Sequence, residues 1–209
     1  MNSEFVEAQS IDAATGVPNV FLTRDLLESS SAQDATRRAQ HYQAASGFTA
    51  NVGDTRAGSL LYNIEVGPRQ HTSVLAVEGK IDNTRRQSAG AGAGSGGGTN
   101  EPNLASGGGF LAHFNQYQRL AVAEYPDPSS DARAATVRRL VQAGRGALEI
   151  LGDQSNPNHL EIWRNFSLPC IDACQTVASA VLDFMSHSMC IHTRNPRMFP
   201  QADACYPIG

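Results

Sequence analysis

Two short segments near the N-terminus carry apolar positions at the three- and four-residue spacing that predicts helices. In residues 21–28 this spacing is made by Phe21 or Leu22, Leu26 and Leu27. The next segment begins at Ser31, whose side chain suits the cap of a helix with Asp34 in its first turn. Ala35 and Ala39 lie four residues apart, so both are expected to face a sheet.

Three segments with strand character follow, at residues 47–52, 60–66 and 73–77. Within 60–66 the side chains alternate, so that one face carries Leu60, Tyr62, Ile64 and Val66 and the other carries Leu61, Asn63 and Glu65. Short turn-rich connectors separate these segments, and we therefore expect an antiparallel meander.

Residues 82–109 interrupt this pattern. Their centre consists almost entirely of glycine, alanine and serine, which offer little apolar surface to offset the entropy cost of ordering a chain. We expect a flexible surface insert here, within one domain that spans residues 16–196. A polar loop over residues 1–15 is expected before that domain, and an irregular tail over residues 197–209 after it.

The pattern after the insert predicts a strand at residues 110–114 and a helix from Asp131 to about residue 142, capped by Ser129 or Ser130. The arginines of this helix, among them Arg133, are expected to face solvent, and Gly144 is expected to end it. A short helix at 148–151 and a hairpin of 176–185 with 188–192 complete an α+β pattern.

Composition narrows the range of partners. The 209 residues have a net charge of −4 and a pI of about 5.8, so the chain offers no basic face for nucleic acid. No apolar run is long enough to span a membrane. The first residues include Glu4 and Glu7 and do not resemble a signal peptide, which favours a cytoplasmic or organellar location over secretion.

All four cysteines lie near the C-terminus, at Cys170, Cys174, Cys190 and Cys205. Without a signal peptide, reduced structural thiols are the expected state. One alternative is a zinc site made by Cys170, Cys174, Cys190 and His192, although the Cys190–His192 spacing is unusual for such sites. Another is a nucleophilic cysteine of a different enzyme class, for which no flanking signature is present. The prediction is therefore no metal and no cofactor.

Three stretches resemble one known family in their order and spacing. They are residues 16–18 (Gly-Val-Pro) running into 21–28 (Phe-Leu-Thr-Arg-Asp-Leu-Leu-Glu), residues 110–117 (Phe-Leu-Ala-His-Phe-Asn-Gln-Tyr) and residues 176–183 (Thr-Val-Ala-Ser-Ala-Val-Leu-Asp). Together they are similar to the isopenicillin N acyltransferase family of cysteine N-terminal-nucleophile hydrolases. The resemblance implies part of an αββα sandwich, with an antiparallel sheet and flanking helices.

The resemblance also implies site residues. Asn115 matches the asparagine of the family's His-x-Asn motif, which implies that its side-chain amide is a donor to the oxyanion of a tetrahedral intermediate. His113 lies two residues earlier on the predicted strand, on the same face, where it would orient the amide or line the pocket. The family mechanism does not require this histidine, because the free α-amino group of the nucleophile serves as the base.

Two departures from the family pattern limit the expected activity. No cysteine precedes Cys170, so the nucleophile that the family exposes by self-cleavage has no match. An arginine that some members place before the third stretch is also unmatched, since Ala173 and Cys174 stand there.

We therefore expect a fragment or subunit of an amidohydrolase or acyltransferase that is inactive alone. It would pair with its missing N-terminal part or with another chain, and the completed enzyme would act on a small acyl-amide or acyl-thioester. A non-catalytic interaction domain is the alternative.

Overall fold

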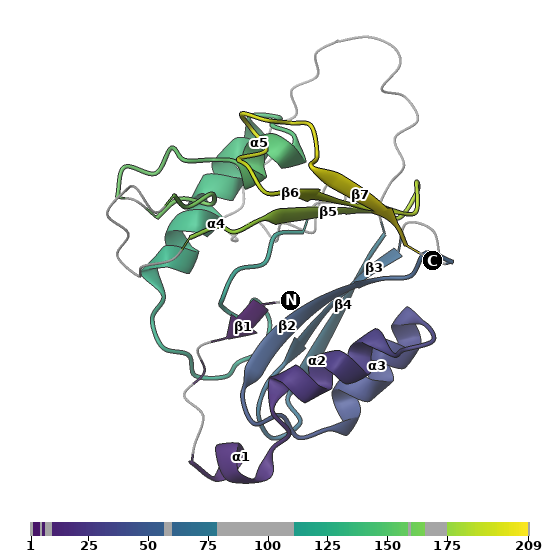
Figure 1. The fold of residues 1–209 in the computed structure, drawn as a ribbon. Coiled ribbons are helices and arrows are strands. Elements are labelled where there is room, and N and C mark those ends of the chain that lie inside the picture. The colour runs from purple at the N-terminus through teal and green to yellow at the C-terminus, as the bar shows by residue number, and fades with distance from the viewer. Residues whose placement is uncertain are drawn as a thin grey trace, which may run out of the picture.

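The computed structural model describes residues 2–4, 6, 10–56, 60–78, 111–158, 160–165 and 175–208. Helices and antiparallel sheets alternate in it, which confirms the predicted α+β class. Figure 1 shows one helix pair covering a four-stranded sheet, with a three-stranded sheet on the other side of that sheet and two further helices beyond it. The predicted insert at 82–109 lies outside the described residues.

The larger sheet consists of four antiparallel strands in the order β1 (Asn2–Glu4), β2 (Gly47–Gly53), β3 (Leu60–Val66) and β4 (Thr72–Glu78). The last three form the predicted meander, with β2 and β4 slightly longer than expected. Ala50 pairs with Ile64 and Thr49 pairs with Glu65, so apolar and polar cross-strand pairs alternate along β2 and β3.

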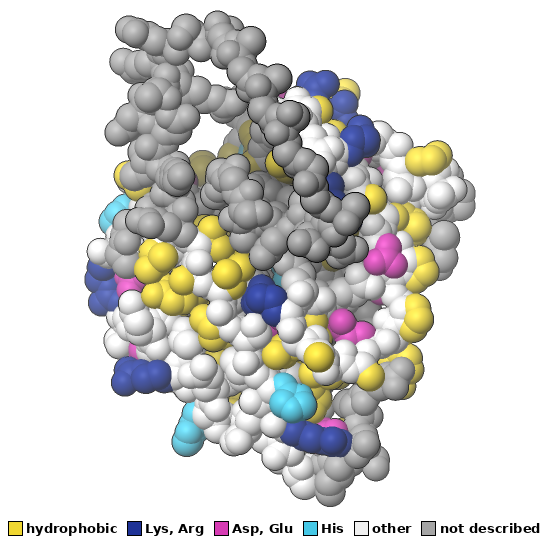
Figure 2. Space-filling view, turned by 180° about the vertical axis from the view of Figure 1, so that it is seen from behind, with side chains coloured by type: hydrophobic (Ala, Val, Ile, Leu, Met, Phe, Trp, Pro, Cys, Tyr) yellow, Lys and Arg dark blue, Asp and Glu magenta, His cyan; other side chains and the backbone are white. Residues whose placement is uncertain are grey.

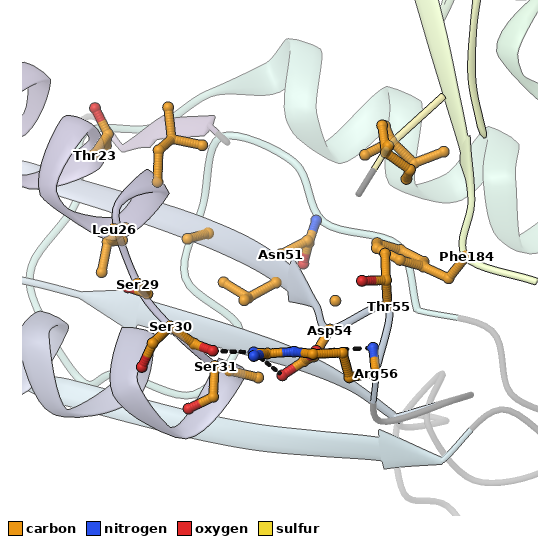
Figure 3. Close-up of a pocket in the computed structure, with 17 residues that line it drawn as sticks. Thr23, Leu26, Ser29, Ser30, Ser31, Asn51, Asp54, Thr55, Arg56 and Phe184 are labelled. Carbon is orange, nitrogen blue, oxygen red and sulfur yellow. Dashed lines mark hydrogen bonds and ion pairs between the residues drawn. The ribbon is translucent and has the colours of Figure 1, made fainter. Parts of the chain in front are cut away.

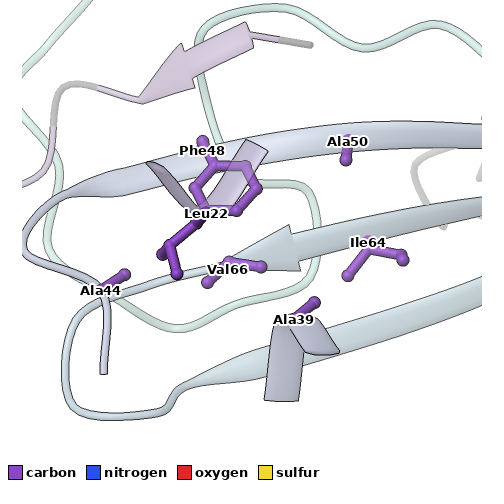
Figure 4. Close-up of a cluster of buried hydrophobic side chains, with 7 residues drawn as sticks. All are labelled: Leu22, Ala39, Ala44, Phe48, Ala50, Ile64 and Val66. Carbon is purple, nitrogen blue, oxygen red and sulfur yellow. The ribbon is translucent and has the colours of Figure 1, made fainter. Parts of the chain in front are cut away.

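Helices α2 (Asn19–Leu27) and α3 (Ala32–His41) cover one face of this sheet. Leu22 and Leu26 contact the core as predicted, but Leu27 was wrongly expected there and is 80% exposed. The Ser31 hydroxyl caps α3 by accepting a hydrogen bond from the backbone N–H of Asp34 at 3.0 Å. Figure 4 shows the core between the helices and the sheet, formed by Leu22, Ala39, Ala44, Phe48, Ala50, Ile64 and Val66. The two helices therefore bury the apolar face that the alternation in residues 60–66 predicts.

The prediction of a loop over residues 1–15 is wrong. Strand β1 pairs with β2, and helix α1 (Ser10–Thr15) follows. Asp12 in α1 is buried and binds the Arg69 guanidinium through both carboxylate oxygens, at 3.1 and 3.3 Å. These contacts reach residues about fifty positions away, and a polar local sequence gives no sign of them.

The residues directly after α1 lie against the loop that follows α3. The backbone of Val17 exchanges hydrogen bonds with Gln43 and Ala45 at 2.7 and 2.9 Å. A Cβ on Gly16 would lie 2.5 Å from backbone atoms of Ala45, so this close approach requires glycine. The Gly-Val-Pro stretch thus marks a crossing of two backbone segments.

Helix α4 (Pro128–Gln142) begins three residues earlier than predicted, because Asp127 and not a serine caps it. The Asp127 carboxylate accepts from the backbone N–H of Ser129 at 3.0 Å, and Pro128 suits the first helical position. Gly144 ends the helix with a φ of 70°, as predicted. The short helix α5 (Ala147–Leu151) follows and packs with α4 in a second core around Val137, Leu140 and Ile150.

The smaller sheet contains the predicted hairpin, made by β5 (Ser179–Asp183) and β6 (Ser188–His192). The expectation of an irregular tail is wrong, since β7 (Ala204–Pro207) pairs with β6. Cys190 and Cys205 are directly opposed in that pairing and form a disulfide. Reduced thiols were therefore the wrong expectation for these two residues, and Cys190 has no thiolate left for zinc. Cys170 and Cys174 lie outside the described residues.

The distribution of charged side chains on the surface agrees with the similar numbers of basic and acidic residues in the sequence. On the face that Figure 2 shows, basic and acidic side chains are scattered among apolar and neutral ones and do not gather into one patch. Among the described residues, no helix combines the length and apolar character needed to cross a membrane.

Candidate functional site

The predicted site residues lie on residues 111–127, which run between the larger sheet and α4 and are called the crossing segment below. Residues 111–113 have no regular secondary structure, and beyond them only an isolated bridge joins Phe114 and Gln116. The prediction that a strand at 110–114 carries the site is therefore wrong for its described residues, and Phe110 lies outside them. Without a strand, the two-residue spacing no longer places His113 and Asn115 on one sheet face.

Asn115 is held by α4. Its side-chain oxygen accepts a hydrogen bond from Nη2 of Arg133 at 2.9 Å. Arginine carries only donors, so the atom that faces Arg133 must be the amide oxygen, and the amide orientation is fixed by this contact. The Nδ2 donor therefore lies on the opposite side of the amide, away from the guanidinium.

The backbone of Asn115 is fixed by a second contact with the same helix. Its N–H donates to Oγ of Ser130 at 3.0 Å, and Nη2 of Arg133 donates to the same oxygen at 3.0 Å. The Ser130 hydroxyl donates in turn to Asp127 at 2.6 Å. Ser130 is fully buried and uses its hydroxyl both as acceptor and as donor, so the first turns of α4 hold the Asn115 backbone and side chain together.

His113 points to different partners. Its Nε2 lies 3.0 Å from Oγ1 of Thr49 and 3.6 Å from a carboxylate oxygen of Glu65, and its side chain is 1% exposed. The same ring nitrogen faces both groups, whereas a relay from a carboxylate through histidine to a hydroxyl would use both ring nitrogens. These contacts attach His113 to the larger sheet, and Arg133 takes the orienting role that we predicted for this histidine.

Glu65 is the centre of a buried polar layer on this face of the sheet. Its carboxylate accepts hydrogen bonds from the backbone N–H groups of Gln118 at 2.7 Å, Arg119 at 3.0 Å and Leu120 at 3.0 Å. Burial alone would raise the pKa of Glu65. The hydrogen bonds from His113, Gln118 and Leu120 and the charge of Arg119 outweigh it, so that the pKa lies below its ordinary value.

Arg119 extends this layer across the sheet. Its guanidinium donates to Oδ1 of Asn63 at 2.6 Å and to Oγ of Ser73 at 3.0 Å, and Asn63 donates to Asn51 at 2.7 Å. Burial lowers the pKa of Arg119, and the carboxylate of Glu65 opposes that effect. Nη1 of Arg119 lies 3.6 Å from Glu65 and has no hydrogen-bond partner in the described part of the chain, so the ion pair with Glu65 is its main contact there. The layer thus fixes the crossing segment to the sheet through hydrogen bonds and this ion pair.

Glu124 makes a contact within the crossing segment. Both of its carboxylate oxygens accept from the backbone N–H of Tyr117, at 3.0 and 3.1 Å. Burial, together with the negative charge of Glu65, raises the pKa of Glu124 despite this hydrogen bond.

Chemically, this region presents an oriented amide and buried charges, and no cysteine is among its described residues. Asn115 was predicted from the His-x-Asn pattern, but Arg133, Ser130 and Asp127 were not predicted as its partners. Arg133 was expected to face solvent, yet its side chain is only 20% exposed. The signal that could have indicated it is its position three residues after Ser130, on one side of a helix.

A pocket lies in another part of the structure. A pocket of about 800 Å³ opens between α2, the end of β2 and the turn of the second sheet, and none of the residues that hold Asn115 lines it (Figure 3). The oriented amide and the cavity are thus separate features of the described chain.

Comparison with known proteins supplies one match. The family described as acyl-coenzyme A:6-aminopenicillanic acid acyl-transferase matches residues 1–197. No curated protein and no solved structure matches the chain. Because the match covers nearly all of the 209 residues, the chain belongs to the acyl-coenzyme A:6-aminopenicillanic acid acyl-transferase family.

Proposed function

We propose that this chain supplies the oxyanion-stabilising side of a cysteine N-terminal-nucleophile acyltransferase or amidohydrolase, and that it does not itself attack the carbonyl. In this proposal the substrate is a small acyl-amide or acyl-thioester. Asn115 donates from Nδ2 to the oxygen on which negative charge develops. The nucleophilic cysteine comes from sequence beyond these 209 residues.

The observation that carries the proposal is the orientation of the Asn115 amide. An oxyanion donor must be set in place before the reaction, because the stabilisation is lost if the donor has to reorganise. The Arg133 guanidinium fixes the amide oxygen, and Ser130 fixes the backbone of the same residue. Membership of the acyltransferase family supports the reaction class.

The state of the cysteines supports the second half of the proposal. Cys190 and Cys205 are joined in a disulfide, so neither offers a thiolate. No cysteine precedes Cys170 in the sequence, whereas the family mechanism uses a cysteine at the start of the processed chain. An incomplete αββα sandwich is part of the same proposal, and the layers in Figure 1 support it.

The first test measures release of acyl product from amides and thioesters by the purified 209-residue chain. The expected result is no release above the buffer rate. Turnover that disappears on changing Cys170, Cys174, Cys190 or Cys205 to serine would contradict the proposal.

The second test joins the chain to the coding sequence directly upstream of Met1 and repeats the assay. If that sequence supplies a cysteine and activity appears, Asn115→Ala should lower kcat by about 100- to 1000-fold, the cost of one lost oxyanion donor. Gln116→Ala, one residue further along, is the matched control. Unchanged kcat in Asn115→Ala would contradict the role of the amide. Failure to gain activity would favour the alternative of a non-catalytic interaction domain.

A further inference from the structure

The pocket in Figure 3 has a composition that selects a kind of ligand. Its walls come from α2, from β2 and the turn after it, and from Leu182, Phe184 and Ile208 of the C-terminal region. Its volume of about 800 Å³ falls within the range of about 300–1,000 Å³ that is usual for small-molecule sites.

The apolar walls depend on a close approach of the two sheets. The Phe184 ring lies so near Gly53 that a Cβ on that glycine would overlap it. Leu26 and Phe184 lie on opposite sides of the cavity in Figure 3. Apolar side chains from different layers thus enclose a space that an apolar ligand body can fill.

The only charged residues that line the described pocket neutralise each other. Arg56 binds Asp54 at 3.0 and 3.1 Å, and it also donates to the backbone oxygen of Ser30. Hydrogen bonds from the Arg56 side chain and backbone lower the pKa of Asp54 to about 2, so the pair remains ionised near neutral pH. A neutralised ion pair gives no net attraction for a charged ligand, and burying an unpaired charge is costly.

The rest of the polar lining consists of neutral groups, which are Asn51 and the hydroxyls of Thr23, Thr55 and the serines at 29–31. The Ser29 hydroxyl is buried without a hydrogen-bond partner in the part of the chain that the structure describes. A buried hydroxyl without a partner is a group that a ligand or a water molecule would satisfy.

We infer that this pocket binds an uncharged amphipathic small molecule, with its apolar body against Leu182 and Phe184 and a neutral hydrogen-bonding end toward the hydroxyls and Asn51. The pocket would do so independently of the proposed function, because neither Asn115 nor Arg133 lines it. A test therefore needs binding and not turnover.

Three probes with one chain length separate the contribution of head-group charge: octanamide, octanoate and octylammonium. Binding to the full 209-residue chain is measured at pH 7 by NMR titration or calorimetry, below the concentrations at which the probes aggregate. Octanamide should bind with a Kd of about 0.1–1 mM, well within the affinity ceiling for a ligand of ten heavy atoms. The two charged probes should bind at least about tenfold more weakly, because their heads lack a partner.

Two variants test the neutral ion pair directly. Asp54→Asn leaves the charge of Arg56 unbalanced and should strengthen octanoate binding, whereas Arg56→Gln leaves Asp54 unbalanced and should strengthen octylammonium binding. Opposite changes in the two variants support the inference. Preference of the unmodified chain for either charged probe would overturn it.

A matched pair of variants tests the location. Leu182→Gln removes an apolar group from the pocket wall at a residue that is 50% exposed, so the fold should tolerate it. It should weaken octanamide binding at least about fivefold, since apolar contact is lost. Met185→Gln, in the turn after β5 and outside the pocket lining, should leave binding unchanged. Absence of saturable octanamide binding, or equal loss in both variants, would overturn the inference.

Discussion

Ile64 and Glu65 are neighbours in β3, and neither exposes any surface, but opposite means bury them. Ile64 lies under α2 and α3 in an apolar core with Leu22 and Ala39 (Figure 4). Glu65 lies under the crossing segment, where three backbone N–H groups bind its carboxylate. Apolar packing therefore covers one face of the sheet, whereas hydrogen bonds and the Arg119–Glu65 ion pair hold the segment over the other face.

This difference between the two faces decides how strictly each one fixes the position of the element that covers it. Apolar burial is roughly proportional to area and has no direction, so a helix can shift slightly and still cover Phe48 and Ile64. A buried carboxylate tolerates no such shift, because each lost donor leaves part of its charge unsatisfied. The polar face thus fixes the path of the segment that carries Asn115.

The largest expected effect comes from removing the carboxylate at the centre of the polar face. Glu65→Ala leaves Arg119 and three backbone donors without their buried partner, so the free energy of unfolding should fall by about 3–5 kcal/mol. Urea denaturation measures it, and hydrogen exchange should show lost protection at Gln118 and Leu120. A loss below about 1 kcal/mol would mean that the polar layer does not hold the segment.

A smaller effect is expected from the adjacent residue on the apolar face. Ile64→Val removes one methylene from the core and should cost about 0.5–1.5 kcal/mol. Exchange protection at residues 118–120 should stay unchanged, because those amides bind to the opposite face. Loss of protection there would contradict the separation of the two faces.

The pH dependence of stability should differ between the unmodified chain and Glu65→Gln. The folded-state pKa of Glu65 is lowered, so its carboxylate stabilises the fold above the unfolded pKa, and this contribution is lost as pH falls through the folded pKa. Glu124 has a raised pKa and acts with the opposite sign, stabilising below its unfolded pKa. Between pH 6 and pH 3, the unmodified chain should lose more stability than Glu65→Gln. Parallel urea midpoints across this range would contradict the role of Glu65.

The smallest effect is expected for an ion pair outside both faces. Arg24 on α2 and Glu28 at its C-terminal cap lie 3.3 Å apart, with side chains that are 72% and 58% exposed. Water screens such pairs, so Glu28→Gln should leave the urea midpoint unchanged within experimental error. A clear decrease would show that exposed charge also supports this helix.

Local sequence determined much of the first half of the fold. Alternation in residues 60–66 placed β3 and its two faces, and the helix spacing with Ser31 placed α3 and its cap. Gly144 correctly marked the end of α4. These features depend on residues within one or two turns of each other, and such residues are visible in a short stretch of sequence.

Contacts between distant residues decided the rest. The tertiary structure added β1, α1 and β7, paired Cys190 with Cys205, and gave residues 111–113 no regular secondary structure. Shortly after them, Gln118 binds Glu65, which is more than fifty residues away. The sequence by itself predicted Asn115 as an oxyanion donor, and only the fold showed that Arg133 orients its amide. A motif records which chemical groups are present, whereas their direction depends on which elements pack together, and no local pattern contains that information.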